Sequence, residues 1–244
     1  MAFTEKIIMD IKNYLSNALE KLNIEISHTQ LSQFERYFNL LVEWNSKINL
    51  TRITQPEEVA VKHFADSLTL LKYVDLKTNA RLVDVGTGAG FPGIPIKIMR
   101  PDINLTLLDS LNKRLVFLEE VCNSIGIDAE FVHTRAEQGG ADGDFREKFD
   151  VVTSRAVARL NTLSEYCIPY VKVGGTFVAM KGPELQEELK ESQNAVKVLG
   201  GEVENVWEFS LPDDSRRTIV AIKKISHTPK QYPRQGTKIK NKPL

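Results

Sequence analysis

The pattern of apolar positions divides the chain into two parts. Over residues 5–22 and 28–45, and again after Pro56, apolar side chains recur every three or four positions, which predicts amphipathic helices. From residue 81 onward, short apolar runs alternate with helical patterns. We therefore predict a small helical subdomain over residues 1–75, followed over residues 76–225 by an α/β domain with a doubly wound, mostly parallel sheet.

Seven strands are expected in the α/β domain. They cover residues 81–86, 104–109, 129–133, 149–154, 175–181, 203–209 and 218–222. Helices are expected from residue 92 and over residues 111–125, 160–171 and 184–199. Only a turn around Pro212 separates the last two strands, so they must pair as an antiparallel hairpin. Such a closing hairpin is typical of class I, Rossmann-like methyltransferases, whereas nicotinamide folds of the Rossmann type commonly end with a parallel strand.

Composition places the chain among globular proteins that dissolve in water, with 42% hydrophobic and 26% charged residues. No apolar run approaches the ~20 residues that cross a bilayer, and the first residues lack the apolar core of a signal peptide. The two cysteines, Cys122 and Cys167, have neither metal-ligand spacing nor a disulfide pattern. We therefore expect a cytoplasmic protein with buried cysteines, no metal site and no membrane contact.

Charge is unevenly distributed along the chain, although the formal net charge is zero. Residues 223–244 contain seven lysines and arginines and no acidic residue. This segment has three prolines and no apolar periodicity, so we predict a basic C-terminal arm over residues 226–244 and not a further element of the domain. Tyr232 lies between Lys230 and Arg234, and this combination of charge and stacking suits RNA. A disordered, solubilising tail is the alternative.

The candidate ligand site is the segment 81–93, a short apolar run that ends in an acid and then breaks into glycines. Gly86, Gly88 and Gly90 allow positive φ angles and let backbone N–H groups approach a ligand closely. Gly88-x-Gly90-x-x-Gly93 also has the spacing of a dinucleotide fingerprint, which taken alone is a weak signal. The glycines therefore predict a nucleotide-type binding loop without deciding which nucleotide binds.

Two acids indicate the nature of the ligand. Asp84, at the end of the first strand, favours a cationic sulfonium or ammonium group and would repel a pyrophosphate. Asp109 ends the next strand, where an acid can accept hydrogen bonds from both ribose hydroxyls of an adenosine. Together with the glycine loop, these acids favour S-adenosylmethionine over the dinucleotide of a nicotinamide-dependent oxidoreductase. The alternative is that this segment is an ordinary βαβ turn with an acid on the surface and binds no ligand.

The segment after the fourth strand, Ser154-Arg-Ala-Val-Ala158, narrows the class of acceptor. It is not the Asn/Asp-Pro-Pro-aromatic sequence that commonly holds an exocyclic amine, and Cys167 lacks the preceding proline expected of a pyrimidine-C5 nucleophile. A ring nitrogen such as guanine N7 already has an in-plane lone pair, so only alignment is needed. We therefore expect no catalytic base, and Arg155 or Lys181 would orient the substrate through a carbonyl or phosphate.

A polar cluster precedes the α/β domain. Lys62, His63, Asp66 and Ser67 lie within one and a half helical turns. They could line a cleft beside the glycine loop or form a solvated helix face. Because exposed charged faces are the usual condition of helices, the spacing favours the solvated face.

Along nearly its whole length the chain resembles one family, the small-subunit ribosomal RNA guanine-N7 methyltransferases called RsmG or GidB. The most specific segments are Gly-Phe-Pro-Gly-Ile-Pro and Ser-Arg-Ala. The full set is Trp44-Asn-x-x-Ile-Asn-Leu-Thr51, His63-Phe-x-Asp-Ser67, Val83-Asp-Val-Gly-x-Gly-x-Gly-Phe-Pro-Gly-Ile-Pro95, Asp109-Ser-x-x-Lys-Arg114, Arg135-Ala-Glu137, Ser154-Arg-Ala-Val-Ala158, Tyr232-Pro-Arg234 and Lys242-Pro-Leu244. The resemblance implies an S-adenosylmethionine-dependent enzyme that methylates a guanine in the decoding-region loop of 16S ribosomal RNA.

By the same resemblance, Gly86, Phe91, Ala136, Glu137 and Arg155 contact the methyl donor. Phe91 would offer an apolar wall, and Ala136 is small enough for an adenine to lie against the backbone. Glu137 could instead be a residue of a helix first turn.

The resemblance also bears on partners. The substrate would be free 16S ribosomal RNA or the small ribosomal subunit, and we expect the protein to be a monomer. The tail departs from the family where it reads Pro233-Arg-Gln-Gly-Thr-Lys238, and residues 139–143 are looser than usual, which affects RNA affinity more than identity. A non-catalytic RNA-binding module that retains the fold is the remaining alternative.

Overall fold

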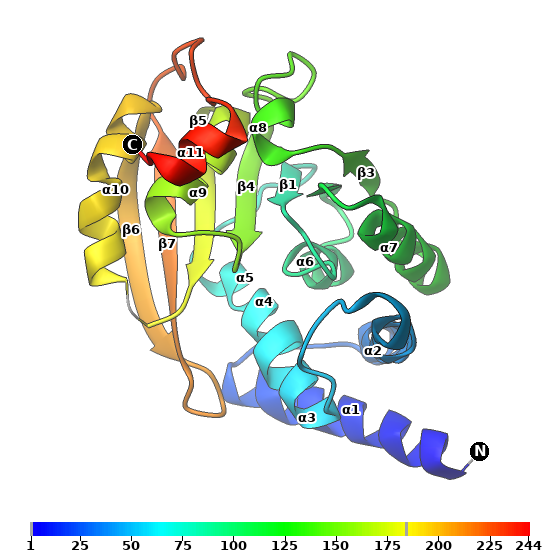
Figure 1. The fold of residues 1–244 in the computed structure, drawn as a ribbon. Helices are drawn as coiled ribbons and strands as arrows, with labels where there is room; N and C mark the ends of the chain where they lie inside the picture. The colour runs from blue at the N-terminus through cyan, green and yellow to red at the C-terminus, as the bar shows by residue number, and fades with distance from the viewer. Residues whose placement is uncertain (1, 184) are drawn as a thin grey trace.

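The computed structural model describes residues 2–183 and 185–244, with side chains from residue 11 onward. The chain forms one seven-stranded sheet in the order β3-β2-β1-β4-β5-β7-β6, with helices on both faces (Figure 1). The strands are β1 (Arg81–Val85), β2 (Asn104–Asp109), β3 (Glu130–His133), β4 (Phe149–Arg155), β5 (Val171–Lys181), β6 (Gly201–Ser210) and β7 (Arg216–Lys224). Strands β1 to β5 are parallel, and β7 pairs antiparallel with both β5 and β6. The predicted methyltransferase-like α/β fold with its closing hairpin is confirmed.

The helices that follow the strands lie close to their predicted positions. They are α6 (Gly93–Met99), α7 (Asn112–Ile125), α8 (Ala136–Gly139), α9 (Leu160–Cys167) and α10 (Gln186–Val198). Helix α9 ends earlier than predicted and continues into a short 3₁₀ turn, η2 (Ile168–Tyr170), because Pro169 has no N–H to continue an α-helix. The predicted helix over residues 184–199 is α10, and residue 184 lies outside the described residues.

The sheet changes its direction of winding between β1 and β4. These strands are hydrogen-bonded neighbours, with Leu82 opposite Val151, although β2 and β3 lie between them in the sequence. Four successive residues of β1 and five of β2 are buried, because helices cover both faces of the sheet. The carboxyl ends of parallel strands at such a switch point are where open α/β sheets bind ligands.

The N-terminal helices pack on one face of the sheet and share its core. They are α1 (Ala2–Lys21), α2 (His28–Ile48), α3 (Pro56–Val59), the π-helical turn η1 (Ala60–Ala65), α4 (Asp66–Leu68) and α5 (Leu70–Tyr73). Leu19, Phe34 and Phe38 belong to the same buried cluster as Ile94 of α6 and Phe117 of α7. The described side chains of residues 11–75 therefore form no core of their own, and the predicted helical subdomain is continuous with the sheet.

The C-terminal segment differs from the predicted arm. Residues Gly236–Asn241 form a helix, α11, which lies beside α8 and α9 in Figure 1. Ile239 of α11 is fully buried in the second core cluster, and Arg234 pairs with the buried Glu165 of α9. One buried isoleucine in an otherwise polar helix leaves no periodicity, which is why the apolar pattern could not show this element.

Other sequence expectations concern the whole chain. Both cysteines are free and buried, as predicted. None of the described helices has the length and apolar character needed to cross a membrane.

Candidate functional site

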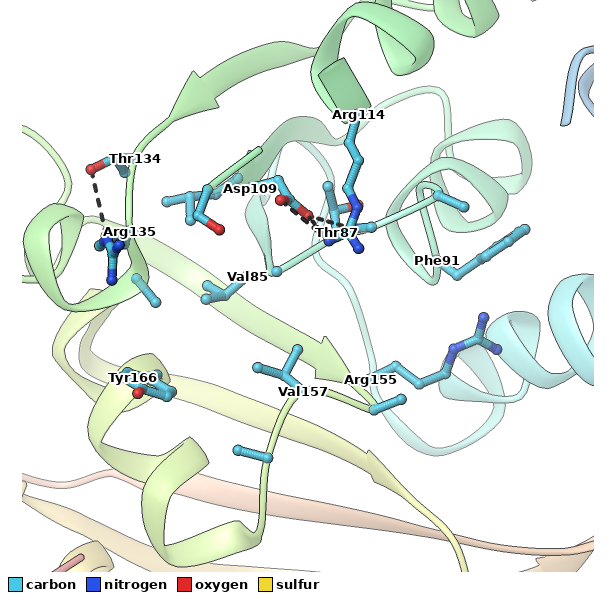
Figure 2. Close-up of a pocket in the computed structure, with 18 of the residues that line it drawn as sticks. Val85, Thr87, Phe91, Asp109, Arg114, Thr134, Arg135, Arg155, Val157 and Tyr166 are labelled. Carbon is cyan, nitrogen blue, oxygen red and sulfur yellow. Dashed lines mark hydrogen bonds and ion pairs between the residues drawn. The ribbon is translucent and has the colours of Figure 1, made fainter. Parts of the chain in front are cut away.

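A cavity of about 600 Å³ opens at the carboxyl ends of β1, β2 and β4. The predicted residues Gly86, Gly88, Phe91, Asp109, Ala136, Glu137 and Arg155 all line it. Figure 2 shows this pocket, with Asp109 and Arg114 meeting beside the glycine loop and Arg155 extending from the end of β4 toward the helices. The structure therefore brings together side chains that the sequence places more than sixty positions apart.

The glycine loop follows β1 in a conformation that side chains would oppose. Gly86 has φ +72° and Gly88 has φ +62°, and the N–H of Gly86 donates to the carbonyl oxygen of Leu108 at 2.8 Å. A Cβ on Gly86 would lie 2.8 Å from Cγ2 of Val157, on the opposite wall of the cavity. Only glycine at position 86 leaves the passage between the loop and Val157 open to a ligand, as the sequence predicts.

Asp109 organises the loop from the end of β2. Its carboxylate accepts hydrogen bonds from the N–H groups of Gly88 and Leu111, both at 2.9 Å, and from the Arg114 guanidinium at 3.2 Å. Arg114 also approaches the other oxygen, Oδ1, at 3.4 Å, so a ribose hydroxyl that binds Asp109 would replace one of these two long contacts with Arg114. Asp109 lines the cavity and suits the role predicted for it.

Asp84 lies beneath the glycine loop and does not line the cavity. Its Oδ2 accepts hydrogen bonds from Oγ1 of Thr87 at 2.8 Å and from the N–H of Gly93 at 3.0 Å. Burial raises the pKa of Asp84 to about 6, although these two hydrogen bonds act in the opposite direction. Asp84 is therefore separated from the cavity by the loop, and its predicted pairing with a ligand cation stays a prediction. The carboxylate supports the loop from inside, and its charge lies just behind the cavity wall.

Phe91 is held in a stack of rings. The His63 ring lies parallel to it with centroids 4.5 Å apart, the Tyr37 ring lies on it at 5.4 Å, and the Arg155 guanidinium lies 5.0 Å from its centre. The Tyr37 hydroxyl donates a hydrogen bond to the carbonyl oxygen of Ala89. Helix α2 thus fixes the glycine loop directly.

Ala136 and Glu137 follow β3 and begin the short helix α8. The carbonyl oxygen of Ala136 accepts a hydrogen bond from the Tyr170 hydroxyl at 2.7 Å, which fixes the first turn. Glu137 is a first-turn residue and also lines the cavity, so the two interpretations left open by the sequence are compatible.

The polar cluster at residues 62–67 does not form the solvated face that the spacing favours, and that prediction is wrong. Asp66 and Ser67 are buried. Asp66 accepts hydrogen bonds from Arg155 at 2.7 Å and from Arg217 of β7 at 3.1 Å. The apolar neighbours Val59, Ala60, Val61, Phe64, Ala65 and Leu68 are all buried, so this helical segment is enclosed on nearly all sides. These apolar positions on nearly all sides of the helix were the sequence signal that could have indicated a buried cluster.

His63 is a neutral ring in this cluster. Burial and the nearby Arg155 lower the pKa of His63 to about 3. Arg155 approaches Nδ1 at 3.2 Å, and because a guanidinium only donates, Nδ1 is the acceptor. Nε2 then carries the hydrogen and donates to Oγ1 of Thr51 at 2.9 Å. With both nitrogens engaged, His63 holds its neighbours in place.

A second cavity, of about 320 Å³, adjoins the first and shares His63, Arg155 and Ala156 with it. Four cationic side chains contribute to its wall, from Lys62, Arg155, Lys181 and Arg217. Lys181 lines this cavity, but its Nζ already donates to the carbonyl oxygen of Ala158 at 2.9 Å and pairs with Glu188 at 2.7 Å.

Several lining residues were not singled out from the sequence. They are Thr51, Arg114, Arg135, Val157, Tyr166, Gly236, Thr237 and Lys240. The family segments quoted above include Thr51, Arg114, Arg135 and Val157. Tyr166 is one of several buried residues of a helix, and the last three lie in the segment predicted to be an arm, so no local pattern marks them.

The residues fit S-adenosylmethionine. Bare backbone at Gly86 admits a ligand, Asp109 is placed for ribose hydroxyls, and negative charge from Asp84 lies behind the loop. Among the described buried side chains, Oδ1 of Asp84 is the nitrogen or oxygen atom that lacks a hydrogen-bond partner. An unpaired acceptor of this kind is compatible with a cationic ligand nearby.

Comparison with known proteins identifies the family to which this site belongs. A family model described as GidB, rRNA small subunit methyltransferase G, matches residues 30–220. Ribosomal RNA small subunit methyltransferase G of Lactobacillus johnsonii is 54% identical over 230 residues, covering 93% of this chain and 96% of that protein. The Clostridium novyi protein of the same name is 49% identical over 243 residues, covering 99% of each chain.

Solved structures support the fold alone. A SAM-dependent O-methyltransferase from Thermotoga maritima has a TM-score of 0.53 and 15% identity, covering 78% of this chain and 72% of that one. TYW2 of M. jannaschii, solved in complex with AdoMet, has a TM-score of 0.50 and 11% identity, covering 61% and 71%. With the fold and the sequence matches in agreement, the chain belongs to the GidB family, rRNA small subunit methyltransferase G.

Proposed function

We propose that this protein transfers the methyl group of S-adenosylmethionine to N7 of a guanine in the decoding-region loop of 16S ribosomal RNA. The observation that carries the proposal is the junction of two cavities at Arg155, His63 and Ala156. One cavity has the glycine loop and the ribose-type acid of a donor site, and the other is lined by four cationic side chains together with Asp66, which pairs with two of them. Membership of the GidB family supports the same reaction.

In the first cavity, Gly86 and Gly88 leave room for the donor, and Asp109 accepts hydrogen bonds from its ribose. Ala136 and Glu137 lie at the adenine end, and Phe91 forms an apolar wall. Asp84 acts through its charge beneath the loop, in a buried environment where charge is weakly screened. Bound there, S-adenosylmethionine supplies an electrophilic methyl group whose sulfonium sulfur keeps the electron pair of the broken S–C bond.

The second cavity would hold the guanine. The lone pair of N7 forms the new bond directly, so no residue of the chain needs to remove a proton. Arg155 is fixed by Asp66 and lies between the cavities, where it can align donor and acceptor. Arg217 and Lys62 add positive charge suited to the guanine carbonyl or an adjacent phosphate. Lys181 is paired with Glu188, as Lys62 is with Glu58 and Arg217 is with Asp66, so each of these cations would share its charge between its partner and the substrate.

Two experiments test the proposal. Titration of the purified protein with S-adenosylhomocysteine and with NADH should show binding of the first and none of the second; the reverse would favour a nicotinamide-dependent oxidoreductase. Incubation with methyl-labelled donor and either deproteinised 16S ribosomal RNA or whole small subunits should label one guanine at N7, located by base mapping. Tight RNA binding without any label would identify a non-catalytic RNA-binding module.

The substrate places the reaction in the cytoplasm, where small ribosomal subunits are found. We further propose that the protein acts as a monomer.

A further inference from the structure

The last part of the chain is fastened to the α/β core at several points. Arg234 donates to the buried carboxylate of Glu165 through its N–H at 2.8 Å and through its guanidinium at 2.6 Å. Arg146 donates to the carbonyl oxygens of Thr228 and Tyr232, both at 2.7 Å. Ile239 is fully buried. These contacts hold α11 in one position against α8 and α9.

Helix α11 meets the first cavity where Ala136 and Glu137 lie. Gly236, Thr237 and Lys240 contribute to the cavity wall. The backbone of Gly236 lies so close to Glu137 that a Cβ at this position would collide with the Glu137 Oε1. Because Glu137 itself lines the cavity, a change in α11 would shift a carboxylate of the donor site.

We propose that α11 forms the outer wall of the methyl donor site and contacts the adenosine end of the donor, so that donor affinity depends on the C-terminal segment. The inference rests on the proposed function. Asp109 marks the position of the ribose, and α11 lies beyond it, next to the segment that follows β3. Gly236 lies against Glu137, so α11 is on the side of the cavity formed by Ala136 and Glu137, where the proposed function puts the adenine.

Two variants test the proposal. One ends at Gln235 and lacks α11 but keeps Arg234 and its partner Glu165. The other, Gly236→Ala, keeps the whole segment and displaces only the Glu137 carboxylate. The second variant keeps the test decisive if loss of Ile239 destabilises the first. The matched controls are Lys238→Ala and Lys242→Ala, which change exposed residues of the same segment that do not line either cavity.

The probes are S-adenosylhomocysteine and 5′-methylthioadenosine, which lacks the amino-acid portion, titrated calorimetrically against each protein. We expect both variants to bind the two probes about tenfold more weakly, by the same factor, and the controls to bind them normally. Unchanged affinity would overturn the proposal, and so would a loss confined to S-adenosylhomocysteine, because α11 would then contact the amino-acid portion. If the unaltered protein bound neither probe, the donor assignment under the proposed function would itself be wrong.

Discussion

Asp66 accepts charge-assisted hydrogen bonds from two arginines while it is almost completely buried. Arg155 is 89 positions away in the sequence and Arg217 is 151 positions away. The side chain of Asp66 is 4% exposed and that of Arg155 is 13% exposed, so water cannot replace either partner easily. The carboxylate therefore fixes the guanidinium that lies between the two cavities.

Replacing Asp66 with asparagine should be costly. The variant Asp66→Asn leaves two guanidinium groups without their counter-charge, and breaking a buried pair in this way costs about 3 kcal/mol. Urea unfolding would measure the loss. The control is Glu191→Gln, which removes a partner of Arg159 in an exposed pair and should leave stability nearly unchanged. Equal losses in the two variants would show that burial of Asp66 has no energetic role.

Asp84 predicts a pH dependence. Its pKa is raised to about 6 in the folded protein from an ordinary value of 3.8. The folded state therefore binds more protons than the unfolded chain between these two pH values, and the free energy of unfolding falls as the pH rises through that window. The full difference is on the order of 3 kcal/mol above pH 7.

The variant Asp84→Asn lacks this titration. Its stability relative to the unaltered protein should rise between about pH 4 and pH 6 and remain constant above about pH 7, as measured by urea unfolding over that range. A constant difference at all pH values would contradict the raised pKa. The same variant should lose more affinity for S-adenosylmethionine than for S-adenosylhomocysteine at pH 7, because only the first has a cationic sulfur that the charge beneath the loop attracts.

At the scale of elements, the loop after β1 combines backbone strain with a steric demand. Gly86→Ala would place a Cβ at φ +72° and 2.8 Å from Val157. Gly126→Ala is the matched control, because Gly126 ends α7 with φ +68° and has open space around its Cβ.

Both substitutions should lower the free energy of unfolding by about 1–2 kcal/mol, because each forces a side chain into the left-handed region. Only Gly86→Ala should also weaken binding of S-adenosylhomocysteine, by at least about tenfold, as Val157 and the new methyl group close the passage. Normal affinity in Gly86→Ala would mean that the donor does not pass between Gly86 and Val157.

The sequence predicts elements well where their signals are local. Within thirty residues the chain contains β1, the glycines after it and Asp109. Their apolar runs and turn residues can be recognised without knowing which distant residues they contact. Helix α11 could not be predicted because its stability comes from Ile239, which is buried in the second core cluster, and from Arg234, whose partner Glu165 lies on α9. Similarly, the burial of Asp66 depends on arginines from β4 and β7, so helix periodicity favoured the wrong interpretation.

At the scale of the whole molecule, the basic C-terminal segment contains two kinds of cation, buried and exposed. Lys224 is buried and donates to the carbonyl oxygens of Ile168 and Leu199, while Arg234 is paired with Glu165. These two cations stabilise the fold and are not available to RNA. Lys230, Lys238 and Lys242 are exposed and remain available for phosphate contacts.

The salt dependence of RNA binding should report those contacts. Replacing Lys238 and Lys242 with glutamine should reduce the slope of log affinity against log salt by about 1.5, because each phosphate contact contributes about 0.7–0.9. The control Lys77→Gln changes an exposed lysine just before β1. It lies at the amino-terminal ends of the parallel strands, away from the cavities at their carboxyl ends, and should leave the slope unchanged. Filter binding at several salt concentrations would decide, and identical slopes would remove this segment from the RNA-binding surface.

The meeting of Asp66 with Arg155 and Arg217 has a consequence for renaturation experiments. The carboxylate of Asp66 on α4 contacts arginines from β4 and from β7. This arrangement therefore forms only after all three elements have packed together. During refolding from urea, circular dichroism should recover before catalytic turnover does. Enzymatic rate would then be a stricter measure of complete assembly than any spectroscopic signal from helices and strands.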